Sequence, residues 1–219
     1  NVKGLAIHDK GRTLKTILNT LDEVGYVVPE PQIVNAMFFG VPQHRERIYI
    51  VGFRKDLGLT AEDFSYPEQK EVTKKWIDVR EENPVPAKYY LSTRYQQTLI
   101  NHKARHAAKG NGFGYDIIPD DGIAHAIVVG GMGRESNLVI DFRQKDLTPT
   151  TNIKGTVNTD GWRKMTPREW ARLQGYPDNF KIVVADASAY KQFGNSVAVP
   201  AIQATAAQLL KSLNDKNIL

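Results

Sequence analysis

The chain has 219 residues, of which 41% are hydrophobic and 24% charged, so it is long enough for one sizeable core, or for one core and a small second module. Its formal net charge of +5 and pI near 9.3 favour an anionic partner such as nucleic acid, and the absence of cysteine excludes disulfides, thiolate metal ligands and a cysteine nucleophile in this sequence. No apolar run approaches the roughly 20 residues of a bilayer crossing, and residues 1–10 do not resemble a secretory signal, so we expect no membrane partner and a cytoplasmic protein.

Helix and strand signals alternate in the first third of the sequence. Apolar residues recur at helical spacing from Leu14 to Val24, with Thr13 as the expected N-cap and Gly25 as the stop. Short runs rich in β-branched and aromatic residues then predict strands at 32–35 and 47–53. This alternation predicts an α/β layer, and the charged, proline-bearing stretch that follows predicts a domain boundary near residue 70.

The middle third predicts a small, loop-rich module. Residues 90–108 read as a helix, and the glycine-rich run Gly110 to Tyr115 must be a loop. A second glycine cluster, Gly130 to Gly133, lies between the short apolar runs 123–129 and 138–140. Glycine clusters beside such short strands leave little room for a large core.

Regular helix signals return near the carboxyl end. Thr166 and Glu169 form a capping box with Pro167 at the first helical position, and Gly175 ends that helix. A second short helix is expected to run through Tyr190 to Gly194. A third begins near residue 200 with its apolar residues on one face.

Three segments carry a family resemblance through their order and spacing. They are Pro42-Gln43-His-Arg45-Glu-Arg47, Thr166-Pro-Arg-Glu-Trp-Ala-Arg-Leu-Gln-Gly-Tyr-Pro-Asp178 and Tyr190-Lys-Gln-Phe-Gly-Asn-Ser-Val197. They resemble the Gln-x-Arg-x-Arg motif and the two closing motifs of the DNA cytosine-5 methyltransferase family. The opening Asn1-Val2 is similar to the residues that follow this family's catalytic glutamate in Glu-Asn-Val.

The resemblance implies both a fold and a division of the chain. The expected fold class is α/β: the C-terminal part of a Rossmann-like, S-adenosylmethionine-dependent methyltransferase domain with an inserted small, loop-rich target-recognition domain. Residues 1–70 would belong to the catalytic domain, 71–161 would be the DNA-binding target-recognition domain, and 162–219 would close the catalytic domain.

The resemblance assigns Gln43, Arg45 and Arg47 to positioning the target base, with the arginines meeting the exocyclic oxygen of a cytosine flipped out of the helix. A strand favours this role, because alternate residues share one face. The alternative is a solvated edge whose arginines pair with Glu46 or another carboxylate.

For the cofactor S-adenosylmethionine, the resemblance places four residues near its methionine moiety: Tyr176, Asn195, Ser196 and Val197. The alternative is a helix stop and restart, in which Gly194 ends one helix before Pro200 opens the next. Both descriptions are compatible. We expect Trp170 to pack in the core without a chemical role.

The predicted target-recognition domain carries the expected DNA contacts. Basic side chains beside flexible backbone suit phosphate contact, and the candidates are Lys103, Arg105, Lys109, Asn111 and Arg134. The alternative is a solvated basic helix face. His102 and His106 lack a third ligand for a metal, and the Gly110 loop follows a helix instead of a strand, so neither a metal site nor a phosphate loop is expected.

The expected function is transfer of a methyl group to carbon 5 of cytosine in a short duplex DNA site, as in restriction-modification systems. This chain alone is expected to be inactive, because the nucleophilic cysteine and the cofactor-binding half are missing, so an N-terminal half or subunit is an expected partner. We expect a bacterial enzyme of the cytoplasm that is associated with the nucleoid through DNA binding. Two alternatives stay open: a DNA-binding module without catalysis, and an RNA cytosine-5 methyltransferase.

Overall fold

The fold was obtained as a computed structural model, which describes residues 1–130, 133–150, 153 and 155–218. These residues form two compact units. Unit 1 consists of residues 1–40, 45–72 and 199–219, and unit 2 consists of residues 41–44 and 73–198. None of the described helices combines the length and hydrophobicity needed to cross a membrane.

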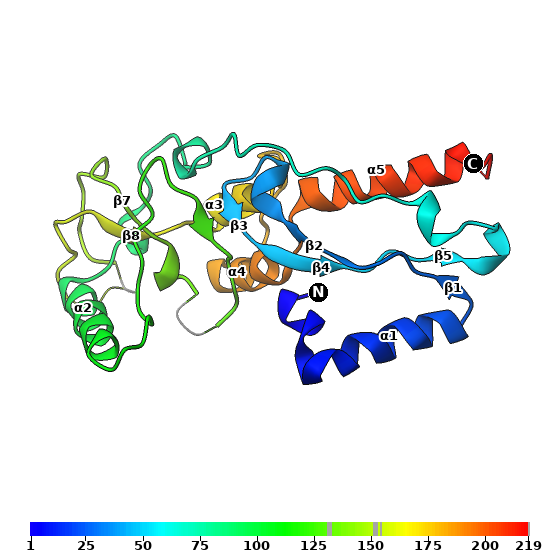
Figure 1. The fold of residues 1–219 in the computed structure, drawn as a ribbon. Helices are drawn as coiled ribbons and strands as arrows, with labels where there is room; N and C mark the ends of the chain where they lie inside the picture. The colour runs from blue at the N-terminus through cyan, green and yellow to red at the C-terminus, as the bar shows by residue number, and fades with distance from the viewer. Residues whose placement is uncertain (131–132, 151–152, 154, 219) are drawn as a thin grey trace. The chain divides into compact units, whose positions relative to one another are not determined.

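Unit 1 is a small α/β layer. Its helices are α1 (Arg12–Glu23) and α5 (Val199–Asp215), and its strands are β1 (Tyr26–Val27), β2 (Gln32–Asn35), β4 (Glu46–Tyr49) and β5 (Phe53–Arg54). Short 3-10 turns lie at Lys3–Ala6, His8–Gly11, Ala36–Phe39, Lys55–Leu57 and Ala61–Asp63. Strand β2 pairs with β4 and β1 pairs with β5, both antiparallel. Helices α1 and α5 lie on opposite sides of the β2–β4 ribbon (Figure 1).

The core of unit 1 explains the spacing of its apolar residues. Val51, Phe53 and Phe64 are buried, and Leu209 and Leu213 of α5 pack against them. The leucines are four residues apart, so they share one face of the helix. Full burial of a side chain of this size contributes about 1.5–3 kcal/mol, and the partly buried leucines gain a share of that, which holds α5 on this core.

The structure differs from the sequence-based expectations at two points in unit 1. The residue before α1 is Gly11 at φ +82°, whereas Thr13 lies inside the helix with its Oγ1 2.6 Å from Nδ1 of His8, so Thr13 is not the N-cap. The expected strand 47–53 is also two strands, because β4 ends at Tyr49 and Phe53 pairs with β1.

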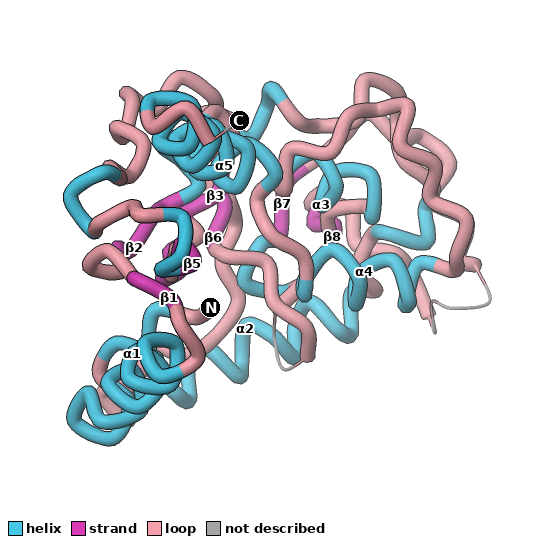
Figure 2. Tube along the Cα trace, turned by 90° about the vertical axis from the view of Figure 1, so that its right-hand side faces the viewer, coloured by secondary structure: helices cyan, strands magenta, loops and turns pink. Residues whose placement is uncertain are grey.

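Unit 2 holds the remaining elements, joined by long loops (Figure 2). Its helices are α2 (Thr93–Ala107), α3 (Pro167–Leu173) and α4 (Asp186–Asn195), and its strands are β3 (Gln43–His44), β6 (Ala124–His125), β7 (Leu138–Ile140) and β8 (Trp162–Lys164). Short 3-10 turns lie at Trp76–Asp78, Ala87–Tyr89 and Glu135–Asn137. Strand β3 runs parallel to β6, and β7 is antiparallel to β8. The expected loop at 110–115 is confirmed.

Helix α3 forms as the sequence predicts and supplies much of the core of unit 2. The Thr166–Glu169 capping box is present with Pro167 at the start, and Gly175 follows the helix at φ +79°. Trp170 is 1% exposed and meets the ring of Tyr190 edge to face, with centroids 4.8 Å apart. The expected core role of Trp170 is therefore confirmed.

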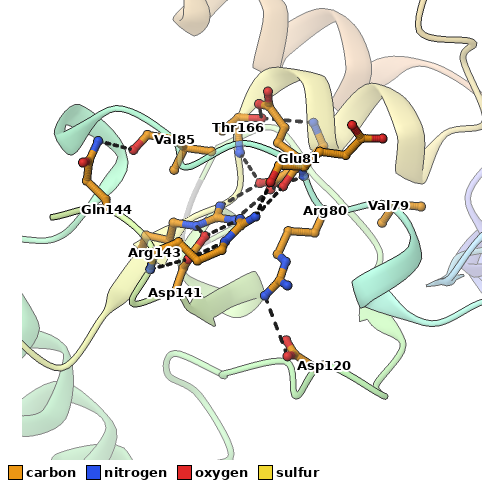
Figure 3. A network of polar contacts seen from close by, with 12 residues as sticks. Val79, Arg80, Glu81, Val85, Asp120, Asp141, Arg143, Gln144 and Thr166 are labelled. Carbon is orange, nitrogen blue, oxygen red and sulfur yellow. Dashed lines mark hydrogen bonds and ion pairs between the residues drawn. The ribbon is translucent and has the colours of Figure 1, made fainter.

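A buried network of charges joins β7, β8 and α3 (Figure 3). The guanidinium of Arg163 donates to both carboxylate oxygens of Glu169 at 2.8 Å and to Asp141 at 3.0 Å. Burial alone would raise the pKa of Asp141, but the bonds from Arg143 and the charge of Arg163 outweigh it and hold that pKa well below its usual value. Asp141 therefore stays ionised at neutral pH, and Arg163 ties the three elements together through its bonds to Asp141 and Glu169.

The expected domain division, 1–70, 71–161 and 162–219, remains a prediction about function. Contacts divide the chain differently after residue 161, because β8 pairs with β7 and α3 and α4 pack in the same core as Ile118, Ile127 and Val139. Residues 162–198 thus fold with unit 2, and only residues 199–219 return to unit 1.

Candidate base and cofactor site

Two arginines lie at the start of β4 in unit 1. Arg45 is only 4% exposed, and its backbone is fixed by a bond from its N–H to Oδ1 of Asn35 at 3.0 Å. Arg47 is half-buried, and its Nη1 donates to the carbonyl of Glu46 at 2.7 Å. We call Arg45 and Arg47 the arginine pair.

The arginine pair is electrostatically unusual. Burial, and then the charge of Arg47, lower the pKa of Arg45 to about 10, and burial lowers the pKa of Arg47. Two guanidiniums held close together in a partly desolvated place favour a ligand rich in oxygen or partial negative charge. Glu46, the carboxylate named in the alternative, has its Oε2 2.5 Å from Lys3 Nζ.

Tyr49, two residues further along β4, also lies near the arginine pair. Burial raises the pKa of its hydroxyl, and the charges of Arg45 and Arg47 act in the opposite direction. Val2, near the amino terminus, forms an antiparallel bridge with Arg47. Sequence reasoning missed Tyr49, although its i+2 spacing from Arg47 on a strand was the available signal.

Gln43 has a different place from the arginines. The chain passes from β3 to β4 between them, so the three residues are not on one face of a single strand as expected. The side chain of Gln43 is 0% exposed, and its Oε1 accepts from the Ile127 N–H at 3.0 Å. Its Nε2 donates to the carbonyl of Leu173 at 2.8 Å and to Oε1 of Gln174 at 3.3 Å. Gln43 therefore supports neighbouring segments through its amide.

Gln174 extends this contact to the third motif. It is 0% exposed, and its Nε2 donates to the carbonyl of Phe193 at 2.8 Å and to that of Ser196 at 3.4 Å. Gln43 and Gln174, the glutamine pair, thus join the three sequence motifs by direct hydrogen bonds. Sequence reasoning gave Gln174 no role, because nothing in its spacing distinguishes a buried amide from an exposed one.

The expected cofactor residues lie together at the end of α4. The hydroxyls of Tyr176 and Ser196 are 2.7 Å apart, and the Tyr176 ring packs against Phe180 and Phe193. Asn195 and Val197 are exposed. The 195–197 turn therefore presents an amide, a hydroxyl and an apolar side chain on a rigid support.

The expected DNA-contact residues of α2 have two kinds of surroundings. Lys103 is engaged within the protein, since its Nζ donates to the Tyr115 carbonyl at 2.9 Å and lies 4.6 Å from the centre of that ring. Arg105, Lys109 and Asn111 are exposed around the helix end. Burial, followed by the charges of His102, Lys109 and Arg105, lowers the pKa of His106.

Arg134 follows the second glycine cluster, of which Gly131 and Met132 lie outside the described residues. Its guanidinium stands 5.3 Å from the centre of the Tyr190 ring. Together with Lys191 and the backbone of 128–130, it lines a small cavity of about 140 Å³. This places a second exposed cation close to α4.

Solved structures of similar fold define the class. The chain superposes on the Dnmt2 methyltransferase of S. pombe with a TM-score of 0.63 and 20% identity, covering 98% of this chain and 66% of that one. It superposes on the Entamoeba histolytica methyltransferase EhMeth with a TM-score of 0.62 and 21% identity, covering 93% and 58%. The expected α/β methyltransferase fold class is therefore confirmed.

The sequence relatives define the family. The model of C-5 cytosine-specific DNA methylases matches residues 1–211, and the chain belongs to this family, as the three motifs predicted. It is 69% identical over 216 residues to the Type II methyltransferase M.HpaII of Haemophilus parainfluenzae, covering 98% of this chain and 60% of that protein. It is 36% identical over 228 residues to the DNA-cytosine methyltransferase of Escherichia coli K12, covering 94% and 47%. The chain thus spans about half of the length of these relatives.

Proposed function

We propose that this chain works within a methyltransferase that transfers a methyl group from S-adenosylmethionine to carbon 5 of cytosine in duplex DNA. Within it, the arginine pair would hold the target base, the 195–197 turn would meet the cofactor, and the module around α2 would contact DNA. The observation that carries the proposal is the direct hydrogen bonding of Gln43, Gln174 and the Phe193–Ser196 segment, since three distant motifs meet there.

The arginine pair suits the chemistry of cytosine methylation. Carbon 5 is a poor nucleophile until a thiolate adds to carbon 6, and that addition pushes electron density toward the exocyclic oxygen of the ring. Guanidiniums fixed on a strand stabilise such developing charge without reorganising. Burial lowers the pKa of Arg45 to about 10, which is still well above neutral pH, so this guanidinium remains charged.

The residues of the 195–197 turn fit the methionine end of S-adenosylmethionine, whose bound sulfonium supplies the methyl group. The exposed Asn195 amide can donate to a carboxylate and accept from an ammonium, and Ser196 is held in place by Tyr176. Val197, 48% exposed, offers an apolar surface beside them. The rest of the cofactor site would come from other parts of the enzyme.

The nucleophile must also come from elsewhere, since the sequence contains no cysteine. We therefore propose that this chain alone transfers no methyl groups, and that an N-terminal half, in the same or a second polypeptide, completes the catalytic domain. Its thiolate would attack carbon 6 of a base taken out of the stack, at a cost of a few kcal/mol that DNA contacts offset.

The direct test is methyl transfer from tritium-labelled S-adenosylmethionine to duplex DNA. The chain joined to the N-terminal half of a family member is expected to label carbon 5 of cytosine, and the chain alone is expected to label nothing. Labelling of transfer RNA in preference to duplex DNA would overturn the choice of substrate. An assembled protein that binds duplex DNA normally but labels neither nucleic acid would overturn the enzymatic proposal and favour a DNA-binding module.

DNA contact by α2 makes a separate prediction. Replacing Arg105 with alanine should weaken duplex binding at all sequences and reduce the slope of log Kd against log salt by about 1, because one phosphate contact is lost. A salt titration of the assembled protein by fluorescence anisotropy measures this. Lys15→Ala, an exposed change on α1, is the matched control and should leave the slope unaltered. An unchanged slope for the Arg105 variant would remove that residue from the DNA interface.

A further inference from the structure

The glutamine pair is a candidate for more than local support. Gln43 and Gln174 are both 0% exposed, and a buried primary amide is costly unless its donors and acceptor are used. The side-chain oxygen of Gln43 accepts from the Ile127 N–H, and its nitrogen donates to the Leu173 carbonyl and to Gln174. The side-chain nitrogen of Gln174 donates to the carbonyls of Phe193 and Ser196. Each amide therefore bridges segments that are distant in sequence.

The segments that these amides bridge belong to two different tasks. Ile127 begins the stretch that leads through Val128 and Val129 into the second glycine cluster and Arg134, an expected DNA contact. Phe193 and Ser196 lie on either side of Gly194 and Asn195, where α4 ends and the 195–197 turn begins. One pair of side chains thus holds both the approach to Arg134 and the expected cofactor turn.

A second contact joins the same two segments without the amides. A Cβ placed on Gly194 would lie 2.7 Å from Cγ2 of Val129 and 3.2 Å from its backbone nitrogen. Only glycine permits this approach, because any side chain would push the two backbones apart. The end of α4 and the 127–130 stretch are therefore packed directly against each other.

We infer that Gln43 and Gln174 are positioning residues that couple DNA contact at Arg134, through residues 127–130, to cofactor binding at the 195–197 turn. This inference rests on the proposed function of both segments. A ligand that fixes the backbone of residues 127–130 also fixes the 195–197 turn, since the two share the same amides and the Gly194–Val129 contact. The second ligand then finds its site already ordered and binds more tightly, and the effect is reciprocal.

The coupling is measured in the assembled protein as the ratio of two dissociation constants for one cofactor analogue, without and with DNA. The Kd of S-adenosylhomocysteine, which carries no methyl group to transfer, is determined by calorimetry with and without a duplex that the protein methylates. The wild type is expected to bind at least about fivefold more tightly with DNA, the lower end of ordinary coupling. Gln174→Glu keeps the acceptor for Gln43 and loses the donors to Phe193 and Ser196, so its ratio should fall below about twofold.

Controls separate coupling from general damage. Gln203→Glu makes the same chemical change at an exposed position of α5 and should keep the wild-type ratio. The Gln174→Glu variant should also keep its Kd for DNA in the absence of cofactor, which a merely unfolded protein would lose. A wild type with two normal affinities but a ratio near one would overturn the inference alone. A wild type that does not bind S-adenosylhomocysteine would overturn the proposed function instead.

If the Gln174→Glu variant does not fold, hydrogen exchange of the wild type tests the coupling instead. The Ile127 amide donates to Gln43, so adding S-adenosylhomocysteine without DNA should slow the exchange of a peptide covering residues 127–130. Adding DNA without cofactor should slow exchange at Ser196. Protection confined to the segment that each ligand touches would contradict the coupling.

Discussion

Replacing Arg47 with alanine in the assembled methyltransferase proposed above is expected to lower kcat for methyl transfer by about 10²–10³-fold, the usual effect of removing one fixed group that stabilises a transition state. Arg47 is half-buried on β4, and its guanidinium is anchored by one bond to the Glu46 carbonyl. We expect its charge and its further donors to meet an oxygen of the base. Single-turnover methylation at saturating DNA and cofactor measures this change.

The position of the charge, and not its presence alone, should matter. Arg47→Lys keeps the charge but loses the planar fork, so it should restore only part of the rate. Arg54→Ala on β5 is the matched control, because Nε of that arginine donates to Oδ1 of Asp56 at 3.0 Å on the surface of the same unit. Equal rates for the Arg47 and Arg54 variants would exclude Arg47 from base positioning.

The second large effect is on stability. Arg163→Leu should lower the free energy of unfolding of unit 2 by about 3–5 kcal/mol, because it leaves buried carboxylates without their common partner. Arg163 and Glu169 are both 0% exposed, and removing the guanidinium would leave the carboxylates of Glu169 and Asp141 without the cation that lies between them. All three tryptophans, Trp76, Trp162 and Trp170, lie in unit 2, so urea unfolding followed by tryptophan fluorescence reports on this unit.

A surface ion pair of the same unit supplies the comparison. Lys88 and Asp186 are 2.7 Å apart with side chains 37% and 39% exposed, so Lys88→Met should cost no more than about 1 kcal/mol. If the Arg163 variant were as stable as the Lys88 variant, the charge network would not be what holds β7, β8 and α3 together.

The sequence predicted the elements whose signals are local. The 3.6-residue spacing of Leu14 to Val24 gives α1, and the Thr166–Glu169 box gives the start of α3, because both depend on residues within a few positions of each other. The run 47–53 failed as one strand for the opposite reason. Its break after Tyr49 follows from pairing with two different strands, and pairing partners are not encoded in the run itself.

The sequence indicated which residue types the candidate site would contain. It did not indicate which partners each of these side chains would contact. The motif drew attention to Gln43, Arg45 and Arg47 together, whereas the hydrogen bonds of the structure distinguish Gln43, whose amide fixes other segments, from the two arginines at the start of β4. Lys103 and Arg105 look alike as basic residues of one helix, yet Lys103 holds the Tyr115 carbonyl. Such distinctions depend on partners more than ten positions away, which composition and periodicity do not reveal.

The most direct measurement is a crystal structure of the assembled methyltransferase reacted with S-adenosylmethionine and duplex DNA in which the target cytosine is replaced by 5-fluorocytosine. After the thiolate has added and the methyl group has been transferred, the fluorine on carbon 5 cannot leave as the proton does, so the base stays attached. The account predicts a guanidinium nitrogen of Arg47 within about 3.2 Å of the exocyclic oxygen of that base, a normal hydrogen-bond distance. A trapped base whose oxygen is bound by other residues, with both Arg45 and Arg47 out of reach, would contradict it.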